Sequence, residues 1–199
     1  MLPAVILAAG ASVRMGSPKA LLATPSGRPF AAAIVRALAD AGVTEVVIVT
    51  GHDHDRVVEA VRADAPPIVP RFARNLQPAR GQLSSLWVGM DAALHEETEA
   101  LIVTLVDVPM VNRATIAAVV AAWQHTRAPI VRPAIGDRHG HPVIFDRAVF
   151  AELRAAPLDQ GAKAVVRAHA RNIVDVPVSD EGSLVDVDTP QEYEALRRK

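Results

Sequence analysis

The sequence predicts an α/β fold, in which a mostly parallel central sheet lies between two layers of helices. Short apolar runs alternate with segments of helical periodicity through the first half of the chain. This alternation is typical of a parallel sheet with crossover helices, in a three-layer α/β/α arrangement. Half of the residues are hydrophobic but only 4% are aromatic, so we expect a core built mainly of Ala, Val, Leu and Ile.

The first half of the chain alternates regularly between the two kinds of element. Expected strands are residues 4–7, 45–50, 68–72 and 101–105, and expected helices are residues 29–41, 55–63, 84–95 and 112–123. Pro29 suits a first helical position, and Gly42 suits the stop of the same helix. Asn112 is a suitable N-cap for the fourth helix. The regular order supports the parallel arrangement.

The second half is more mixed. Expected strands are residues 130–131, 142–145, 173–178 and 184–187, and expected helices are residues 147–155 and 162–169. A last helix is expected to begin at Thr189, because Thr189-Pro190-Gln191-Glu192 is a capping box with proline at the first helical position.

The length and composition limit the classes of function. A chain of 199 residues without internal repeats or linkers is expected to form a single domain, residues 1–199. The net charge of −1 gives no basic surface for nucleic acid. The absence of cysteine excludes disulfides, thiolate metal sites and a cysteine nucleophile. We see no signal peptide and no apolar run of the roughly 20 residues needed to span a bilayer, and we expect a cytoplasmic protein.

The loop after the first strand is the strongest candidate site. Gly10 and Gly16 enclose Ser12 and Arg14, and Lys19 follows. Glycine lets the backbone N–H groups approach a ligand closely, and the two cations suit phosphate oxygens. The glycine spacing differs from a Walker A loop and from a dinucleotide fingerprint. We interpret the loop as a triphosphate-binding segment, with an ordinary turn carrying two solvated cations as the alternative.

Carboxylates follow two other expected strands. Asp107 comes after the strand at 101–105, and Asp186 and Asp188 flank the end of the strand at 184–187. Ligands of open α/β sheets bind beyond the carboxyl ends of the strands, so we expect these groups to meet the first loop. Carboxylates are preferred ligands of Mg²⁺. We predict Asp107 and Asp188 as the metal ligands, with Asp186 as the weaker alternative and helix capping as the alternative role for both.

The motifs together resemble those of the MobA-like NTP transferases, and within them those of the molybdenum cofactor cytidylyltransferases. The first motif is Leu7-Ala8-Ala9-Gly10-x-Ser12-x-Arg14-Met15-Gly16 with Lys19. The later segments that resemble the family, in chain order, are Asn75 with Gly81, Ser84, Ser85 and Gly89; Asp107-Val108-Pro109; Gly140-His141-Pro142; Asp159 to Lys163; and Asp186-Val187-Asp188-Thr189-Pro190. The resemblance covers nearly the whole chain.

The resemblance implies a Rossmann-like nucleotidyltransferase fold and a set of site residues. It implies catalytic roles for Arg14, Lys19 and Asp107. The nucleotide-binding residues that it implies are Leu7, Ala8, Ala9, Gly10, Ser12, Arg14, Gly16, Lys19, Asn75, Gly81, Ser84 and Ser85. It places Asp107 at the metal, and it implies that Gly140, His141 and Pro142 lie near the acceptor.

The reaction that the resemblance implies is transfer of CMP from CTP to molybdopterin-type molybdenum cofactor, with release of pyrophosphate and with Mg²⁺ as cofactor. Ala9 is the residue that favours CTP, because the guanylyl branch has glycine there. A molybdenum hydroxylase or its chaperone is then a transient partner. Two alternatives remain open: another phosphorylated acceptor (a sugar, polyol or hydroxy-acid phosphate), and a non-catalytic protein that delivers the cofactor.

The chain departs from the family pattern at three places. Val108 stands where the family often has glutamine, Arg80 where an acidic residue is common, and Leu158 where glycine is usual. These departures lie in or near the segments implied to contact the acceptor and the base. The segments implied to hold phosphate and metal match the family pattern.

Two pairs of histidines could in principle bind a transition metal. For His52 and His54 we prefer a polar strand-to-helix loop with Asp53 or Asp55 as the helix cap. For His141 the alternatives are a position near the acceptor, which the resemblance implies, and a structural or surface role.

Overall fold

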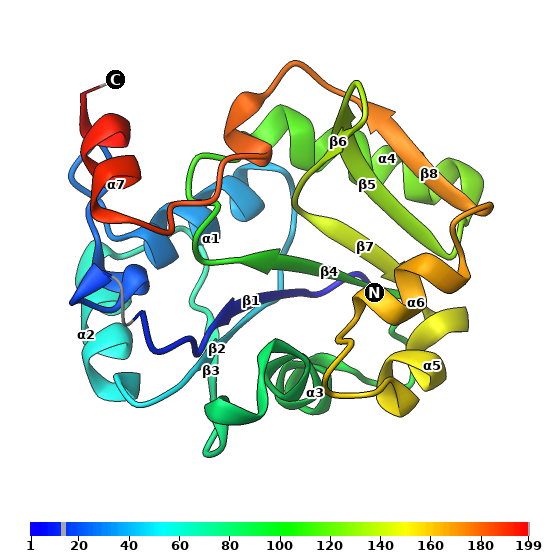
Figure 1. The fold of residues 1–199 in the computed structure, drawn as a ribbon, viewed down its shortest axis with the longest axis horizontal. Helices are drawn as coiled ribbons and strands as arrows, with labels where there is room; N and C mark the ends of the chain where they lie inside the picture. Colours follow the sequence, from blue (N-terminus) through cyan, green and yellow to red (C-terminus); the bar gives the residue numbers. More distant parts are fainter. Residues whose placement is uncertain (13–14, 199) are drawn as a thin grey trace.

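A computed structural model describes residues 1–12 and 15–198, and its fold is the predicted three-layer α/β/α arrangement (Figure 1). The strands are β1 (Ala4–Ala8), β2 (Val46–Thr50), β3 (Arg71–Arg74), β4 (Ala100–Leu105), β5 (Ile130–Ile135), β6 (Arg138–His139), β7 (Val143–Asp146) and β8 (Ile173–Pro177). The α-helices are α1 (Phe30–Asp40), α2 (His54–Asp64), α3 (Gln82–Ala93), α4 (Arg113–Thr126), α5 (Phe150–Ala155), α6 (Lys163–Ala168) and α7 (Pro190–Arg197). Short 3₁₀ helices are η2 (Lys19–Leu21), η3 (Pro78–Arg80), η4 (Arg147–Val149) and η5 (Glu181–Ser183).

The direction of each strand determines which loops meet. Within the described residues the sheet has eight strands in the order β3-β2-β1-β4-β7-β5-β6, and β8 also pairs with β5. β1, β2, β3 and β4 are mutually parallel, whereas β7 is antiparallel to both β4 and β5. β5 therefore runs in the same direction as β4. The residues before β7 consequently lie at the same end of the sheet as the residues after β1 and β4, which we call the carboxyl end of the sheet.

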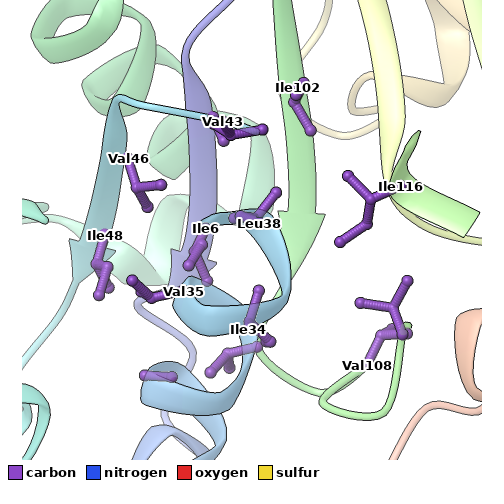
Figure 2. Packing of buried hydrophobic residues seen from close by; sticks show 14 of the residues in the cluster. Ile6, Ile34, Val35, Leu38, Val43, Val46, Ile48, Ile102, Val108 and Ile116 are labelled. Atoms are coloured by element: carbon purple, nitrogen blue, oxygen red, sulfur yellow. The ribbon is translucent and has the colours of Figure 1, made fainter. Parts of the chain in front are cut away.

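Helices cover both faces of the sheet. One core cluster packs α1, α2 and α4 against the sheet, and the other packs α3, α5 and α6 against the opposite face. β2 is buried along its whole length, as expected for a strand covered on both faces. Figure 2 shows the first cluster, with Ile34 and Leu38 of α1 beside Ile6 of β1. The cores are dominated by aliphatic side chains, as the composition predicted.

Most predicted elements are confirmed, including the two caps. The Asn112 side chain accepts a hydrogen bond from Thr115 N at 2.9 Å. Thr189 and Glu192 form the predicted capping box of α7. None of the helices in the described part of the chain is long and apolar enough to cross a membrane.

Two predictions about strands are wrong, and one strand was not predicted. Residues 184–187 do not form a strand, because the N–H of Val187 donates to the Asp107 carbonyl at 2.8 Å instead of to a neighbouring strand. The third strand begins at Arg71 rather than at residue 68, since Pro70 has no N–H with which to start the ladder. The sequence analysis missed β6, which has only two residues.

Candidate functional site

A cavity of about 430 Å³ lies at the carboxyl end of the sheet, beyond β1 and β4. Most of the predicted nucleotide and metal residues line it: Leu7, Ala8, Ala9, Gly10, Ser12, Lys19, Gly81, Ser85, Asp107 and Asp188. Other lining residues, which the sequence analysis did not predict, are Ala11, Met15, Ala20, Pro78, Gln82, Leu105 and Val106. We call this space the first cavity.

Lys19, Asp107 and Asp188 form the charged centre of the first cavity. The Lys19 ammonium lies 3.3 Å from Asp107 Oδ2 and also contacts Asp188 Oδ1. Lys19 and Asp107 are largely buried, with side-chain exposures of 13% and 23%, whereas Asp188 is 40% exposed. Two carboxylates therefore converge on one position inside the cavity.

The core holds Asp107 in place through its neighbour Val108. The Val108 side chain is completely buried in the cluster that contains Ile116 of α4, and Figure 2 shows it on the loop after β4 with its side chain toward Ile116. The departure from the family pattern at this position is thus a core contact. In addition, the Asp107 carbonyl accepts the hydrogen bond from Val187 N, which fixes the loop to the segment before α7.

The capping box of α7 holds Asp188. Glu192 Oε2 accepts hydrogen bonds from the N–H groups of Asp188 and Thr189, both at 2.8 Å. These bonds, with that from the Thr189 hydroxyl, stabilise the ionised form and lower the pKa of Glu192. The Tyr193 hydroxyl also accepts a hydrogen bond from Ala23 N at 3.1 Å, so α7 is tied to the segment that follows Lys19.

One oxygen at this centre is suited to a cation. Asp107 Oδ1 is buried and has no hydrogen-bond partner among residues 1–12 and 15–198. A buried carboxylate oxygen without a donor is costly, so it indicates a ligand. Groups of three or more metal-ligating side chains are absent from the same residues. A divalent ion here would therefore take Asp107 and Asp188 as its protein ligands and complete its shell with phosphate and water oxygens.

Asp186 lies beside this centre and does not line the first cavity. Its side chain is exposed to solvent on one side. Partial desolvation on the other side, together with repulsion from Asp107 and Asp188, raises its pKa. Because residues 184–187 are not a strand, Asp186 and Asp188 do not flank a strand end as predicted but lie in the segment that leads into α7.

Most of the described residues of the first loop line the cavity, and Gly16 is the exception among those predicted to bind nucleotide. Ser12, at a φ of 48°, accepts a hydrogen bond on Oγ from Lys19 N at 3.1 Å and so ties the two ends of the loop together. Gly16 does not line the cavity. Arg14, predicted as catalytic and nucleotide-binding, lies outside the described residues.

The residues of the second predicted nucleotide segment, 75–85, have two different positions: some line the first cavity and others are buried next to it. Gly81 and Ser85 line the cavity, whereas Asn75 and Ser84 are buried behind it. Asn75 Nδ2 donates to both serine hydroxyls at 3.0 Å, and its Oδ1 accepts from Gln77 N at 2.9 Å. Asn75 therefore holds the N-terminal turn of α3 against the preceding loop. Gly81 has a φ of 96°, which glycine adopts readily.

A second cavity, of about 240 Å³, adjoins the first. The two share Leu7, Gln82 and Leu105. The residues that line only the second cavity are Leu83, Leu86, Val103, Arg132, His139, Gly140, His141, Val143, Phe145, Ala162, Lys163 and Val166. It thus combines an apolar wall with basic side chains.

Two of the three predicted acceptor residues line the second cavity. Gly140 and His141 do so, whereas Pro142, which follows a cis peptide bond, is buried and does not. A Cβ at Gly140 would lie 2.2 Å from the Ser183 carbonyl oxygen, so only glycine fits. Burial lowers the pKa of His141, whose Nδ1 lies 3.4 Å from the Val103 carbonyl oxygen. Since a carbonyl only accepts, Nδ1 carries the proton of the neutral ring.

The other basic residues of the second cavity were missed as acceptor candidates. Arg132 Nε donates to Asp175 Oδ1 at 2.7 Å, and His139 lies 3.3 Å from the other oxygen of the same carboxylate. Burial opposes ionisation of Asp175, but these two partners outweigh it and lower its pKa. Lys163 begins α6. It belongs to the family-like segment at residues 159–163, and that position was the available signal.

The histidines after β2 lie in and next to the expected strand-to-helix connection. His54 Nδ1 lies 2.6 Å from the Thr50 hydroxyl, and its ring packs edge-on against Phe72. His52 is exposed. Asp53 precedes α2 but makes no side-chain cap, and it pairs with Arg56 instead.

Comparison with known proteins gives matches over most of the chain. Residues 4–173 match the model of the MobA-like NTP transferase domain. The chain is 33% identical over 143 residues to the bifunctional protein GlmU of Anaeromyxobacter sp. (strain Fw109-5), covering 70% of the chain but only 28% of that relative. It is 32% identical over 203 residues to nicotine blue oxidoreductase of Paenarthrobacter nicotinovorans, covering 96% of the chain and 94% of that relative.

Solved structures agree with this assignment. The structure of Rv0371c from Mycobacterium tuberculosis H37Rv superimposes with a TM-score of 0.81 at 27% identity, covering all of this chain and 97% of that one. A manganese complex of the same protein gives a TM-score of 0.75 at 25% identity, with coverage of 100% and 98%. The family model matches most of the chain and these structures share its fold, and the chain belongs to the MobA-like NTP transferase family.

Proposed function

We propose that this protein is a nucleotidyltransferase that binds a nucleoside triphosphate in the first cavity and a phosphorylated acceptor in the second. The observation that carries the proposal is the convergence of Asp107 and Asp188 on the Lys19 ammonium, at the side of the first cavity. The adjoining second cavity offers basic groups to an anionic acceptor. We also propose that residues 1–199 act as one domain, because each cavity is lined by residues from both halves of the chain and the strands form a single sheet.

Charge neutralisation accounts for most of the proposed catalysis. Asp107 and Asp188 would hold Mg²⁺, which offsets negative charge on the triphosphate. Lys19, and Arg14 by its motif, would bind phosphate oxygens. N–H groups of the first loop, such as that of Gly10, can add hydrogen bonds. Such fixed donors stabilise charge that develops during transfer.

Positioning accounts for the rest. The acceptor phosphate is ionised near neutral pH, so it attacks the α-phosphate without a general base, and pyrophosphate leaves. Leu7, Gln82 and Leu105 border both cavities, so the acceptor and the triphosphate would meet beside them. His141 is held neutral by burial and is suited to hydrogen bonding rather than to charge pairing.

For the substrates we propose CTP and molybdopterin-type molybdenum cofactor. Ala9 lines the first cavity, and its alanine supports a cytidylyl donor on the family pattern. The second cavity has an apolar wall that includes Phe145 and basic groups that include Arg132 and Lys163. That combination suits an acceptor with a flat, poorly solvated body and an anionic group. Transient contact with a molybdenum hydroxylase or its chaperone would then deliver the product.

The test is release of pyrophosphate. Protein with Mg²⁺ is incubated with each of the four NTPs, in the presence of the molybdenum cofactor or of sugar, polyol and hydroxy-acid phosphates. We expect release only with CTP and the molybdenum cofactor. Release with another acceptor replaces the acceptor and keeps the reaction class. No release with any pair contradicts the nucleotidyltransferase proposal, and tight cofactor binding in that case favours a delivery protein.

A redox function is the second candidate, because the relative that matches along nearly its full length is an oxidoreductase. The apolar wall of the second cavity could accept an aromatic substrate for reduction. Consumption of NADH or NADPH with quinone-like dyes, without pyrophosphate release, would favour this candidate. The charged centre formed by Lys19, Asp107 and Asp188 favours the transferase, since hydride transfer does not need it.

A further inference from the structure

We propose that the Lys19 ammonium occupies the divalent-cation position between Asp107 and Asp188 when no nucleotide is bound, and leaves it for the triphosphate when metal and nucleotide bind together. The proposal rests on the proposed function for the identity of the nucleotide. It assigns Lys19 a role in metal affinity in addition to phosphate binding.

The geometry of the charged centre gives the first argument. Lys19 Nζ is 3.3 Å from Asp107 Oδ2 and contacts Asp188 Oδ1 as well. A compact ammonium with three donors can satisfy two carboxylates in the way that a small cation does. An ammonium and a metal ion cannot both occupy this position, because like charges in a partly buried site repel strongly. Binding of the metal therefore requires Lys19 Nζ to move.

The surroundings show which partner is free to move. Asp107 is fixed by the burial of Val108 and by the backbone bond from Val187, and Asp188 is fixed by the bond from its N–H to Glu192. Lys19 begins the single-turn helix η2, and the cavity lies along its side chain. A four-carbon stem allows the ammonium to swing while its backbone stays in place.

A triphosphate bound in the first cavity would offer the Lys19 ammonium a second set of partners. The first loop from Leu7 to Ser12 lines the cavity on which Lys19 also opens. A triphosphate against this loop would bring oxygens within reach of Nζ, so the ammonium would exchange carboxylate partners for phosphate partners. Asp107 Oδ1, which has no hydrogen-bond partner among the described residues, would serve the metal.

The exchange predicts coupling between the metal and the nucleotide. Without nucleotide, a metal ion must displace Lys19 from both carboxylates, so its affinity is low. With nucleotide, the displaced ammonium gains a new partner, so the affinity rises. By linkage, the metal must raise the affinity for the nucleotide by the same factor. Free metal would then bind weakly, and the metal–nucleotide complex would bind tightly.

The experiment measures Mn²⁺ binding by the electron paramagnetic resonance signal of free Mn²⁺, without nucleotide and with a non-hydrolysable CTP analogue. Lys19→Met keeps the length of the side chain and removes its charge. We expect this variant to bind Mn²⁺ about tenfold more tightly than the wild type without nucleotide. We also expect it to lose most of the increase that the analogue causes. Asp188→Asn should weaken binding in both states, which identifies the site.

Lys163→Met is the matched control, because it removes the same charge from the second cavity and should leave Mn²⁺ affinity unchanged. Equal tightening in both variants would indicate a general charge effect and would overturn the proposal. Equal or weaker Mn²⁺ binding by Lys19→Met would also overturn it. Lys19→Gln, with folding checked by circular dichroism, replaces Lys19→Met if that variant is unfolded. Because this readout needs no turnover, tighter Mn²⁺ binding in a protein that releases no pyrophosphate would retain the exchange and reject the proposed function.

Discussion

The two cavities differ in how the chain builds them. The charged centre of the first cavity combines one contiguous loop, from Leu7 to Lys19, with two carboxylates that the core and a helix cap hold rigidly. The basic groups of the second cavity come from β5, β6, the β6–β7 connection and α6. One of these groups, His139, is exposed together with its partner Asp175 at the edge of the sheet formed by β6 and β8. The first cavity is thus suited to one kind of ligand, and the second can change its ligand through few substitutions.

This difference matches the chemistry that we propose for each cavity. A triphosphate and a metal need charges at fixed positions, which rigid supports provide. An acceptor is selected by the shape and the charge of the wall that it meets. Substitutions in the first cavity should therefore affect turnover, and substitutions in the second should affect the choice and affinity of the acceptor.

The largest effect is expected at Asp107. Asp107→Asn keeps the size of the side chain and removes its charge, so turnover should fall about 10²–10³-fold while the melting temperature changes little. Asp186→Asn makes the same change outside the cavity and should retain turnover within about twofold. Steady-state pyrophosphate release measures both. Full activity in Asp107→Asn would remove this carboxylate from the mechanism.

The next largest effect is expected on the stability of the fold, at Gly140 in the lining of the second cavity. Gly140→Ala would place a Cβ 2.2 Å from the Ser183 carbonyl oxygen. The backbone would have to shift to relieve this clash. We expect a loss of about 1–3 kcal/mol in the free energy of unfolding, measured by urea denaturation. Gly10→Ala is the counterpart at the first cavity, where a Cβ meets nothing within 4 Å, and it should cost much less. Equal losses would contradict the close approach.

Acceptor affinity should respond to Arg132. Arg132→Met removes a cation from the second cavity and leaves Asp175 with His139 as its remaining partner. We expect the KM for the acceptor to rise about tenfold, as for loss of one charge-assisted contact, with kcat and the KM for the NTP nearly unchanged. Arg138→Met is the control, because Arg138 pairs with Glu181 and does not line the cavity. A fall in kcat alone would place Arg132 in catalysis rather than in binding.

The smallest effect concerns Glu192 and pH. Its folded-state pKa lies below the usual 4.5, so its ionised form stabilises the fold above pH 4.5, and this stabilisation is lost as pH falls through the lowered pKa. Glu192→Gln should reduce the free energy of unfolding by roughly 0.3–0.5 kcal/mol at pH 7, after allowance for solvent screening. At a pH below the lowered pKa, where Glu192 is protonated, the variant should cost nothing. Glu194→Gln, in an exposed pair with Arg198, is the control. Thermal melts from pH 7 down through the lowered pKa measure the difference between variant and wild type. A difference that did not change with pH would contradict the ionic role.

The sequence was sufficient for the fold class and for most of the charged and glycine residues of the first cavity, because their signals are local. Period and capping identify α4 and α7, and the first loop is contiguous with its strand. The second cavity depends on the direction of β7, which brings Gly140 to the carboxyl end of the sheet. Hydrophobic periodicity detects a strand but does not give its direction or its neighbours. The buried role of Asn75 also escaped prediction, because a polar residue near glycine is equally typical of a site and of a support.

The contact between Lys19 and Asp188 joins positions 169 residues apart, and the bond between Ala23 and Tyr193 spans 170. A growing chain emerges from the ribosome N-terminal end first. The first loop is therefore exposed long before the segment around Asp188 exists. The Lys19 ammonium then has no second carboxylate to pair with, and the metal position that we propose lacks a ligand. Under the proposed function, the protein becomes competent only when α7 has formed and docked, and an incomplete chain would neither hold a metal at this position nor consume nucleotide.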